Sequence, residues 1–261
     1  MGENGLIMSL DNVSFSYPGR APVLDGVDLS FYRGDRMGLI GPNGSGKTTM
    51  LHVVMGLLKP FSGRMEVFGK PIREEKDFRE MRPRIGLLFQ DADDQLFSPT
   101  VLEDVAFGPL NLGKSQEEAK AIALKTLASL GLSGFEDRIT YKLSGGEKRL
   151  VSLATVLAME PDVLLLDEPT TGLDESTEKR LIDILKGLDL SYIVVSHNLD
   201  FLMRTTDFIR AMAHGKISLD DESIPHTHVH VHKLGRHVHR HSQGHNHTHE
   251  NAANAPVPEK G

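Results

Sequence analysis

The chain has 261 residues, of which 39% are hydrophobic, carries a formal net charge of −7 and contains no cysteine. This size fits one substantial folded domain, and the missing thiols exclude disulfides, iron–sulfur clusters and thiolate metal sites. The acidic balance argues against general nucleic-acid binding, which usually needs a basic surface stripe, so no nucleic-acid partner is expected. The longest aliphatic run has four residues and the N-terminus lacks a signal-peptide pattern. We therefore expect a cytoplasmic chain unless a partner tethers it to a membrane.

Short apolar runs separated by Gly, Pro and Asp predict β-strands in the first part of the chain. Their ranges are 6–17, 23–32 and 36–40. Three later runs are brief, apolar and bounded by polar residues, as expected of strands buried on both faces of a parallel sheet. These later strands are predicted at 85–89, 163–166 and 192–195.

Helical patterns lie between the predicted strands. Ser115 and Glu118 form a capping box that opens a helix, and Gly131 ends it. Amphipathic patterns predict further helices at 145–159 and 175–188. Strands alternating with helices predict an α/β core with a mostly helical insertion at about 90–160.

A change of composition near residue 220 divides the sequence into two parts. We expect one folded domain at 1–220 and a tail at 221–261, rich in His and Asn, that is disordered without a ligand.

The segment GPNGSGKT, residues 41–48, matches the phosphate-binding loop pattern and stands between a predicted strand and a predicted helix. Its glycines let backbone N–H groups point at phosphate oxygens, and the helix N-terminus adds partial positive charge. Lys47 would reach the β- and γ-phosphates, and Thr48 would bind Mg²⁺. The alternative, a glycine-rich turn with a chance lysine, is disfavoured by the flanking strand and helix. The candidate nucleotide-binding residues of this segment are Gly41, Asn43, Gly44, Ser45, Gly46, Lys47, Thr48 and Thr49.

A pair of carboxylates, Asp167 and Glu168, follows the apolar run at 163–166. The carboxyl ends of strands in open α/β sheets are where ligands collect. Alone, the pair would be read as solvated loop acids; with a phosphate-binding loop upstream, Asp167 is the candidate Mg²⁺ ligand. Glu168 would then orient or deprotonate the attacking water.

Three further features accompany the loop and the acid pair. LSGGE, residues 143–147, precedes a predicted helix, so Ser144, Gly145 and Gly146 form a second anion-binding helix start. Gln90 and His197 each follow a predicted strand. Both would lie at the sheet edge that faces the nucleotide.

In this order the motifs resemble those of the ATPase subunit of an ABC transporter, over about residues 6–219. The resemblance implies a P-loop ABC-type ATPase domain with a mixed sheet, N-terminal antiparallel strands and a helical subdomain. It also implies ATP and Mg²⁺ as cofactors, with ATP held between two subunits. Glu147 departs from the family, which most often has glutamine at this position.

The resemblance also implies roles for single residues. Tyr17, which alone would be read as an ordinary strand aromatic, would stack on adenine. Gln90 would sense the γ-phosphate, bind Mg²⁺ and couple to a membrane partner, while Asp174 would lie at the dimer interface. The segment at 144–146 would clasp ATP bound to the other subunit. The implied catalytic residues are Glu168, His197, Gln90 and Lys47, and the implied magnesium ligands are Thr48, Gln90 and Asp167.

The segment after Gln90, residues 91–108, is similar to the ATPases of energy-coupling-factor importers, which take up cobalt, nickel or vitamins. The similarity implies a transmembrane coupling subunit, whose coupling helix would enter a groove bordered by 91–108, and a membrane substrate-binding subunit. We expect a homodimer, peripheral at the cytoplasmic face of the membrane, because one chain carries the complete motif set.

Ten of the thirteen histidines lie between residues 226 and 250. They are His226, His228, His230, His232, His237, His239, His241, His245, His247 and His249. Neutral imidazole suits nickel and cobalt, and alternate positions share one face of an extended segment. The tail therefore favours a nickel or cobalt importer. A vitamin importer with an incidental metal-binding tail, a soluble ABC-type ATPase and a metal-storage protein remain open at this stage.

Overall fold

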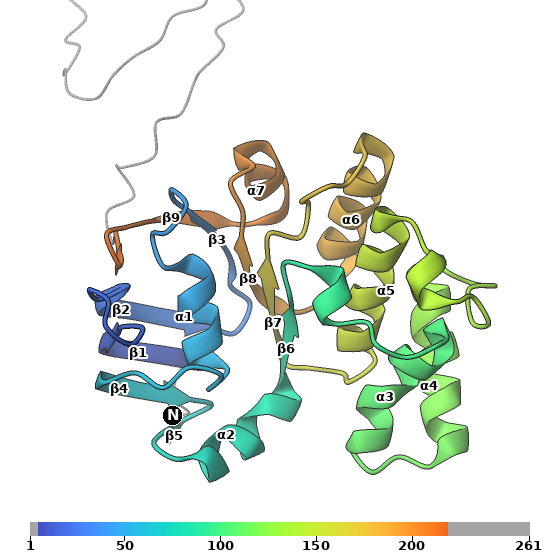
Figure 1. Cartoon of the computed structure of the whole chain (residues 1–261), viewed down its shortest axis with the longest axis horizontal. Helices are drawn as coiled ribbons and strands as arrows, with labels where there is room; N and C mark the ends of the chain where they lie inside the picture. The colour runs from blue at the N-terminus through green and yellow to red at the C-terminus, as the bar shows by residue number, and fades with distance from the viewer. Residues whose placement is uncertain (1–4, 219–261) are drawn as a thin grey trace, which may run out of the picture. The chain divides into compact units, whose positions relative to one another are not determined.

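Two β-sheets and a group of helices form the part of the chain that the structure, a computed structural model, describes: residues 5–218 (Figure 1). The first sheet is antiparallel, with strand order β2-β1-β4-β5. Its strands are β1 (Leu6–Phe15), β2 (Leu24–Tyr32), β4 (Ser62–Val67) and β5 (Lys70–Pro71). In β2 buried and exposed residues largely alternate, because one face of this sheet packs on the core.

The second sheet has six strands in the order β10-β9-β3-β8-β7-β6. Strands β9, β3, β8, β7 and β6 are parallel to their neighbours, and β10 pairs antiparallel with β9. Their bounds are β3 (Arg36–Ile40), β6 (Ile85–Leu88), β7 (Val163–Asp167), β8 (Ser191–Val195), β9 (Phe208–Ala213) and β10 (Lys216–Ile217). All residues of β6, β7 and β8 are buried, which confirms that these apolar runs are strands covered on both faces.

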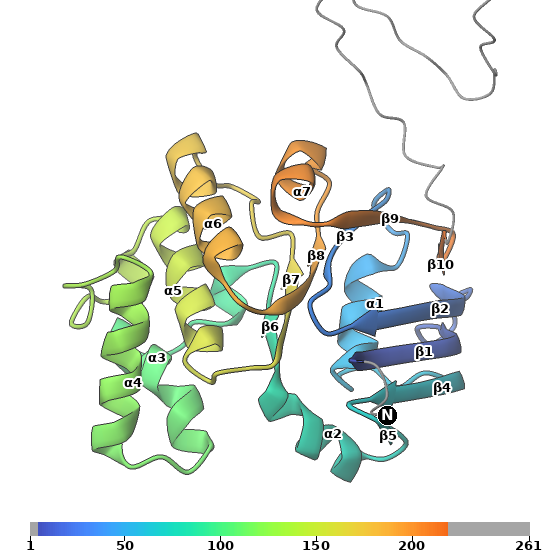
Figure 2. The ribbon, with the colours of Figure 1, turned by 180° about the vertical axis from the view of Figure 1, so that it is seen from behind.

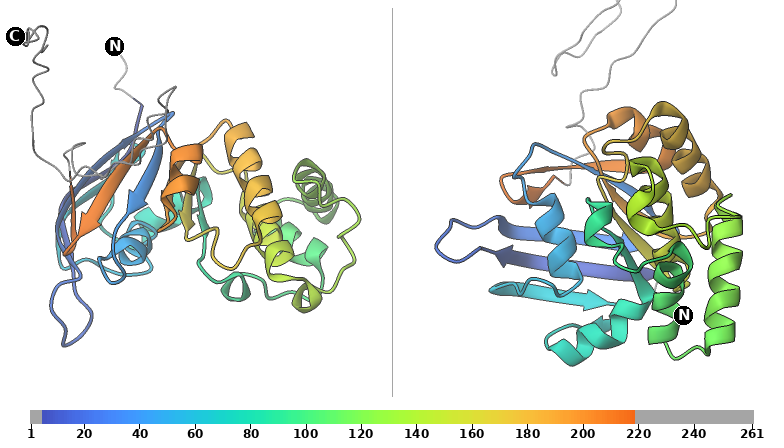
Figure 3. Two further views of the ribbon diagram at one scale, coloured as in Figure 1. Left: turned by 90° about the horizontal axis from the view of Figure 1, so that it is seen from above. Right: turned by 45° about the vertical axis from the view of Figure 1, so that its right-hand side comes forward.

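Helices α3, α4 and α5 gather on the side of the parallel sheet that lies away from the antiparallel strands (Figure 1, Figure 2). Seen from above, the antiparallel sheet and these helices stand at opposite ends of the described residues (Figure 3). The helices are α1 (Lys47–Val54), α2 (Glu75–Met81), α3 (Val101–Asn111), α4 (Gln116–Ser129), α5 (Gly145–Leu157), α6 (Glu175–Gly187) and α7 (Leu199–Thr205). Short 3₁₀ turns are η1 (Arg82–Arg84), η2 (Ala92–Asp94) and η3 (Thr140–Lys142).

Helix α5 joins the helical part to the parallel sheet, because its two faces belong to two apolar clusters. Leu150 and Ala154 pack among α3 and α4, whereas Leu153 and Val156 pack against β6 and β7. A Cβ at Gly86 in β6 would lie 2.1 Å from Val156, so only glycine allows this close approach.

The capping box predicted for α4 is confirmed. The Ser115 hydroxyl accepts from the Glu118 N–H at 3.2 Å, and the Glu118 carboxylate accepts from the Ser115 N–H at 2.8 Å. Gly131, just past the helix, has the left-handed φ of 66° typical of helix C-termini.

Strands β4, β5, β9 and β10 and helices α2 and α7 were not predicted from the sequence. Helix α3 was predicted only as part of the helical insertion at about 90–160. The predicted domain boundary at 220 and the histidine-rich tail lie outside the described residues. Between residues 5 and 218, no helix is long and apolar enough to cross a bilayer.

Candidate functional site

The carboxyl ends of β3, β7 and β8 form the floor of a cleft of about 940 Å³. Eleven of the sequence-predicted residues line it: Tyr17, Gly41, Asn43, Gly44, Gly46, Lys47, Thr48, Thr49, Gln90, Glu168 and His197. Ser45 and Asp167 are buried beneath them. The structure thus brings together residues separated by up to 180 positions of sequence, from 17 to 197.

The glycine-rich loop packs so tightly that two of its glycines have no room for a side chain. A Cβ at Gly41 would lie 2.1 Å from the Met212 carbonyl oxygen, and one at Gly46 would lie 2.8 Å from that of Val23. Gly46 also has a φ of 108°, which favours glycine. It precedes α1 without a side-chain cap, so the first N–H groups of this helix remain available to an anion.

The Lys47 ammonium lies across the loop, donating to the carbonyl oxygens of Gly41 at 2.8 Å and Pro42 at 3.1 Å. The Tyr17 hydroxyl lies 3.4 Å from the Thr49 hydroxyl, and the Tyr17 ring stands edge-on to Phe15, with centroids 4.9 Å apart. A cation, an aromatic face and free helix N–H groups are therefore collected at one cleft, as a nucleotide requires.

The Asp167 side chain is only 2% exposed, and burial raises its pKa; a hydrogen bond from the Thr48 hydroxyl opposes this rise. Its Oδ1 atom has no hydrogen-bond partner among the described residues. A buried carboxylate oxygen without a partner, beside a threonine hydroxyl, fits the all-oxygen ligand set that Mg²⁺ prefers. This chain's own residues are therefore compatible with a magnesium ion between Thr48 and Asp167.

Glu168 has a positive φ of 44°, an uncommon conformation for a residue that is not glycine. Its N–H donates to the Val195 carbonyl at 2.9 Å, and its Oε2 lies 2.9 Å from His197 Nδ1. The Glu168 side chain is 11% exposed, whereas that of His197 is 69% exposed and reaches the open cleft. Backbone strain of this kind concentrates at functional sites.

The segment at 144–146 does not reach this cleft. Ser144 caps α5: its hydroxyl accepts from the Glu147 N–H at 3.3 Å, and the Glu147 carboxylate accepts from the Ser144 N–H at 2.8 Å. The Ser144 N–H and the nearby Arg138 lower the pKa of Glu147. Gly145 lines a neighbouring cavity of about 570 Å³ together with Gln90. In one chain, the two candidate anion-binding helix starts therefore face different spaces.

Asp174 caps α6 beside this segment. Hydrogen bonds from the Ser176 hydroxyl and from Thr177 lower its pKa to about 2. A Cβ at Gly146 would lie 3.0 Å from the Thr177 hydroxyl, so the starts of α5 and α6 are in contact.

Several residues that line the cleft were not predicted from the sequence: Arg20, Val23, Pro42, Thr171 and Val195. Arg20 and Thr171 follow Tyr17 and Glu168 by three residues each. This closeness in sequence to predicted site residues could have indicated them, but closeness alone does not predict a chemical role.

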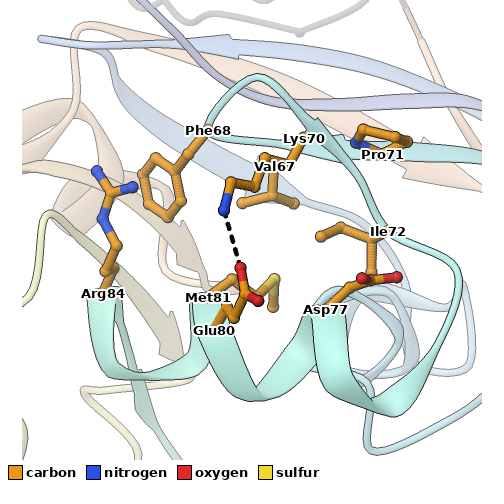
Figure 4. A pocket seen from close by; sticks show the side chains of 9 residues that line it. All are labelled: Val67, Phe68, Lys70, Pro71, Ile72, Asp77, Glu80, Met81 and Arg84. Carbon is orange, nitrogen blue, oxygen red and sulfur yellow. Dashed lines mark hydrogen bonds and ion pairs between the residues drawn. The ribbon is translucent and has the colours of Figure 1, made fainter.

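A smaller cavity of about 350 Å³ lies between the β4–β5 turn and α2 (Figure 4). Lys70 pairs with Glu80 across its mouth at 2.8 Å, and the Arg84 guanidinium lies 3.6 Å from the centre of the Phe68 ring. These cations already have partners, and no glycine-rich loop lines this cavity. The cleft at the parallel strands is the better candidate for a nucleotide.

A family model described as ABC transporter matches residues 24–171. The energy-coupling factor transporter ATP-binding protein EcfA of Methanothermobacter thermautotrophicus is 40% identical over 215 residues, 81% of this chain and 69% of that protein. The cobalt import ATP-binding protein CbiO of Rhodobacter capsulatus is 41% identical over 215 residues, with 81% and 77% covered.

Solved structures agree with these relatives. CbiO1 of Clostridium perfringens, part of the ABC transporter complex CbiONQ, superposes with a TM-score of 0.75 at 35% identity, covering 83% of this chain and 88% of that one. A dimeric ATP-binding cassette in a post-hydrolysis state, bound to ADP and phosphate, gives 0.74 at 27% identity, covering 81% and 96%.

Replacing Asp167 by asparagine should stabilise the nucleotide-free protein at pH 7. Because its pKa is raised in the folded state, the ionised form of Asp167 destabilises that state above this pKa. Removing the charge should raise Tm by about 2–4 °C for each kcal/mol recovered. The gain should shrink as pH falls through the raised pKa, where wild-type Asp167 becomes neutral. Thermal unfolding at several pH values measures it.

Asp162→Asn is the matched control with the opposite sign. The guanidinium of Arg84 lowers the pKa of Asp162, so its ionised form stabilises the folded state. This variant should lower Tm at pH 7, with a difference that also shrinks toward acid pH. A fall in Tm for Asp167→Asn at pH 7 would contradict the assigned cost of burial.

Proposed function

The chain belongs to the ATP-hydrolysing subunits of ABC transporters, of the energy-coupling-factor type, and from this we propose that it powers import of nickel or cobalt. ATP hydrolysis coupled to transport is the activity of the family. The observation that carries the assignment to this site is the cleft in which Glu168 and His197 face the glycine-rich loop. The metal cargo is the finer part of the proposal.

ATP binding is assigned to residues of the loop and its surroundings. Lys47 and the free N–H groups of α1 bind the β- and γ-phosphates, and Tyr17 stacks on adenine. Thr48, Gln90 and Asp167 would hold Mg²⁺, which supplies charge neutralisation for the phosphates. The unpartnered Asp167 Oδ1 supports this assignment.

Glu168 is the proposed general base for the attacking water, oriented by His197. Its carboxylate is mostly shielded from solvent but reaches His197 Nδ1 at 2.9 Å, so its position is fixed before substrate arrives. The exposed His197 ring then remains free to contact the γ-phosphate through its other nitrogen.

Two copies of the chain are proposed to close on ATP. The segment at 144–146 lies outside the cleft of its own chain, so it is available to a nucleotide bound by a second copy. The dimeric structural relative bound to ADP and phosphate supports this arrangement. Because the chain carries both halves of such a site, we propose a homodimer in which ATP is the bridge, and in which cleavage of ATP followed by loss of the products releases the pair.

A membrane partner is proposed to dock near Gln90. Phe97 and Phe107 are 66% and 46% exposed, and their rings meet edge-to-face with centroids 4.8 Å apart. The Asp104 carboxylate accepts from the N–H groups of Phe97 and Ser98 and fixes this loop. An exposed aromatic pair is typical of a contact site for an apolar helix. We assign it to the transmembrane coupling subunit, which would place the chain at the cytoplasmic face of the membrane beside a substrate-binding subunit.

The metal cargo rests on two independent supports. One relative carries cobalt import in its name. The other is the set of ten histidines at 226–250, whose neutral imidazoles suit nickel and cobalt. Because an imported ion meets the membrane subunits first, we assign the tail to buffering or sensing of newly arrived metal. A vitamin importer with an incidental metal-binding tail is the outcome that uptake experiments would reveal instead.

Glu168→Gln should leave ATP binding intact while stopping turnover, because the amide keeps the size of the side chain but cannot accept a proton. We expect steady-state ATPase activity to fall by about 10²–10⁴-fold, the usual contribution of a general base. Glu160→Gln, an exposed glutamate in the α5–β7 turn, is the matched control and should retain activity. Normal turnover in the Glu168 variant would contradict the assigned role.

Phe97→Ser should weaken the complex with the transmembrane coupling subunit without changing the ATPase activity of the isolated chain. Truncating a central aromatic contact typically costs about 2 kcal/mol of binding, or roughly thirtyfold in affinity. Met203→Ser, 59% exposed on α7, removes comparable apolar surface elsewhere. Co-purification of the whole transporter measures the effect, and equal loss from both variants would remove the docking assignment.

Cells that express the whole transporter should accumulate radioactive nickel or cobalt only when Lys47 is intact. Full-length chain should also bind Ni²⁺ in calorimetry at pH 7.5, and deletion of 226–250 should abolish this heat. Binding should weaken by at least about tenfold at pH 5.5, because imidazole must lose its proton to bind metal. Uptake of a vitamin instead of either metal would contradict the proposed metal cargo, while the ATPase assignment would remain.

A further inference from the structure

A buried arginine on α5 holds the end of β6, where Gln90 begins its loop. Arg149 is 4% exposed, and its guanidinium donates to the Phe89 carbonyl at 2.6 Å and to the Gln90 carbonyl. The charges of Asp91 and Asp167 act on it and partly offset its burial. Burying a guanidinium is costly, and here it serves to fix the backbone of two consecutive residues.

Two neighbouring contacts fasten the same loop to α5. The Gln95 side chain accepts from the Phe89 N–H at 3.2 Å and donates to the Ser152 carbonyl at 2.9 Å and the Thr155 hydroxyl at 2.8 Å. Lys148 pairs with Asp93 at 2.5 Å. The loop at 89–95 is therefore tied to α5 at three points, although it is continuous with β6 of the sheet.

Ser144 caps the start of α5, and Gly146 lies in its first turn, three residues before Arg149. Gly146 lies against Thr177, and the N–H and hydroxyl of Thr177 both donate to Asp174 at 3.0 Å. The start of α5 is thus supported by the start of α6. The loop of Gln90 is thus bonded to residues 148–155 of one 13-residue helix, and the segment at 144–146 forms the start of the same helix.

We propose that Arg149 is a positioning residue that makes the loop of Gln90 and helix α5 move as one unit. Occupancy of the chain's own nucleotide cleft, sensed at Gln90, then sets the position of Ser144 and Gly146 toward the nucleotide of the second copy. The two ATP sites of the dimer are thereby coupled through a rigid connection inside each chain. This inference rests on the proposed function, because it requires ATP to be shared between two copies.

The test is the cooperativity of ATP hydrolysis by the full-length chain. The wild-type protein should show a Hill coefficient of about 2, which is the limit for two coupled sites. Arg149→Met should lower the Hill coefficient toward about 1 and reduce kcat by about tenfold. A change of this size is within the range observed when residues that couple two sites are mutated. Affinity of each protomer for a non-hydrolysable ATP analogue should stay within about twofold, because the Arg149 guanidinium bonds to the Phe89 and Gln90 carbonyls and to none of residues 41–48.

Two further variants keep the result interpretable if Arg149→Met is unstable. Arg149→Lys keeps the charge but lacks the planar fork, so it should give an intermediate Hill coefficient. Gln95→Met removes a neighbouring contact without removing a charge and should shift cooperativity in the same direction. The matched control is Arg180→Met, whose guanidinium ties α6 to the Leu130 carbonyl after α4 and has no hydrogen bond to the loop at 89–95.

A wild-type Hill coefficient in Arg149→Met would overturn the inference, and so would an equal loss in Arg180→Met, which would indicate a general effect of packing. Wild-type protein that hydrolyses ATP without cooperativity would overturn the coupling alone. Wild-type protein that neither dimerises nor hydrolyses ATP would remove the proposed function itself.

Discussion

The alignment of the parallel strands is the constraint on which the site depends. Leu39 of β3 and Asp167 of β7 both pair with Val195 of β8, so three chain segments end at the same level of one sheet edge. The glycine-rich loop follows β3 directly, Asp167 ends β7 and is followed by Glu168, and His197 lies two residues past the end of β8. A slip of one register position would move each group by about 3.3 Å and turn alternate side chains to the other face. Because β7 and β8 are entirely buried, such a slip is strongly disfavoured.

Around this edge the protein retains features that work against its own stability. Asp167 carries a carboxylate oxygen without a partner, and Glu168 holds a left-handed backbone conformation. Two glycines of the loop leave no room for a Cβ against the Met212 and Val23 carbonyls, so the loop can pack this tightly only with glycine, at an entropic cost. The continuous apolar cluster that links β1, β2, α1 and the parallel strands offsets these costs. Nucleotide and Mg²⁺ would convert the same features into binding energy.

Local sequence patterns predicted those parts of the structure whose conformation depends on only a few neighbouring residues. The loop at 41–48, the acid pair and the capping box of Ser115 are each recognisable within a few residues, and all were found. Contacts that depend on tertiary packing were not, among them Arg149 on the carbonyls of Phe89 and Gln90. The turn between β4 and β5 was also not predicted, because β5 consists of only two exposed residues and gives little periodic signal.

Glu147 illustrates how one departure from the expected motif is accommodated. A carboxylate at this position caps α5 through the Ser144 N–H, as a neutral glutamine amide would, and gains from the helix dipole. Its negative charge would also repel the phosphates that this helix start is proposed to meet. Arg138 pairs with it at 2.9 Å and stacks on Phe135, so the local charge is balanced before any nucleotide arrives. The carboxylate therefore strengthens the cap, while Arg138 offsets its charge beside the proposed anion-binding helix start.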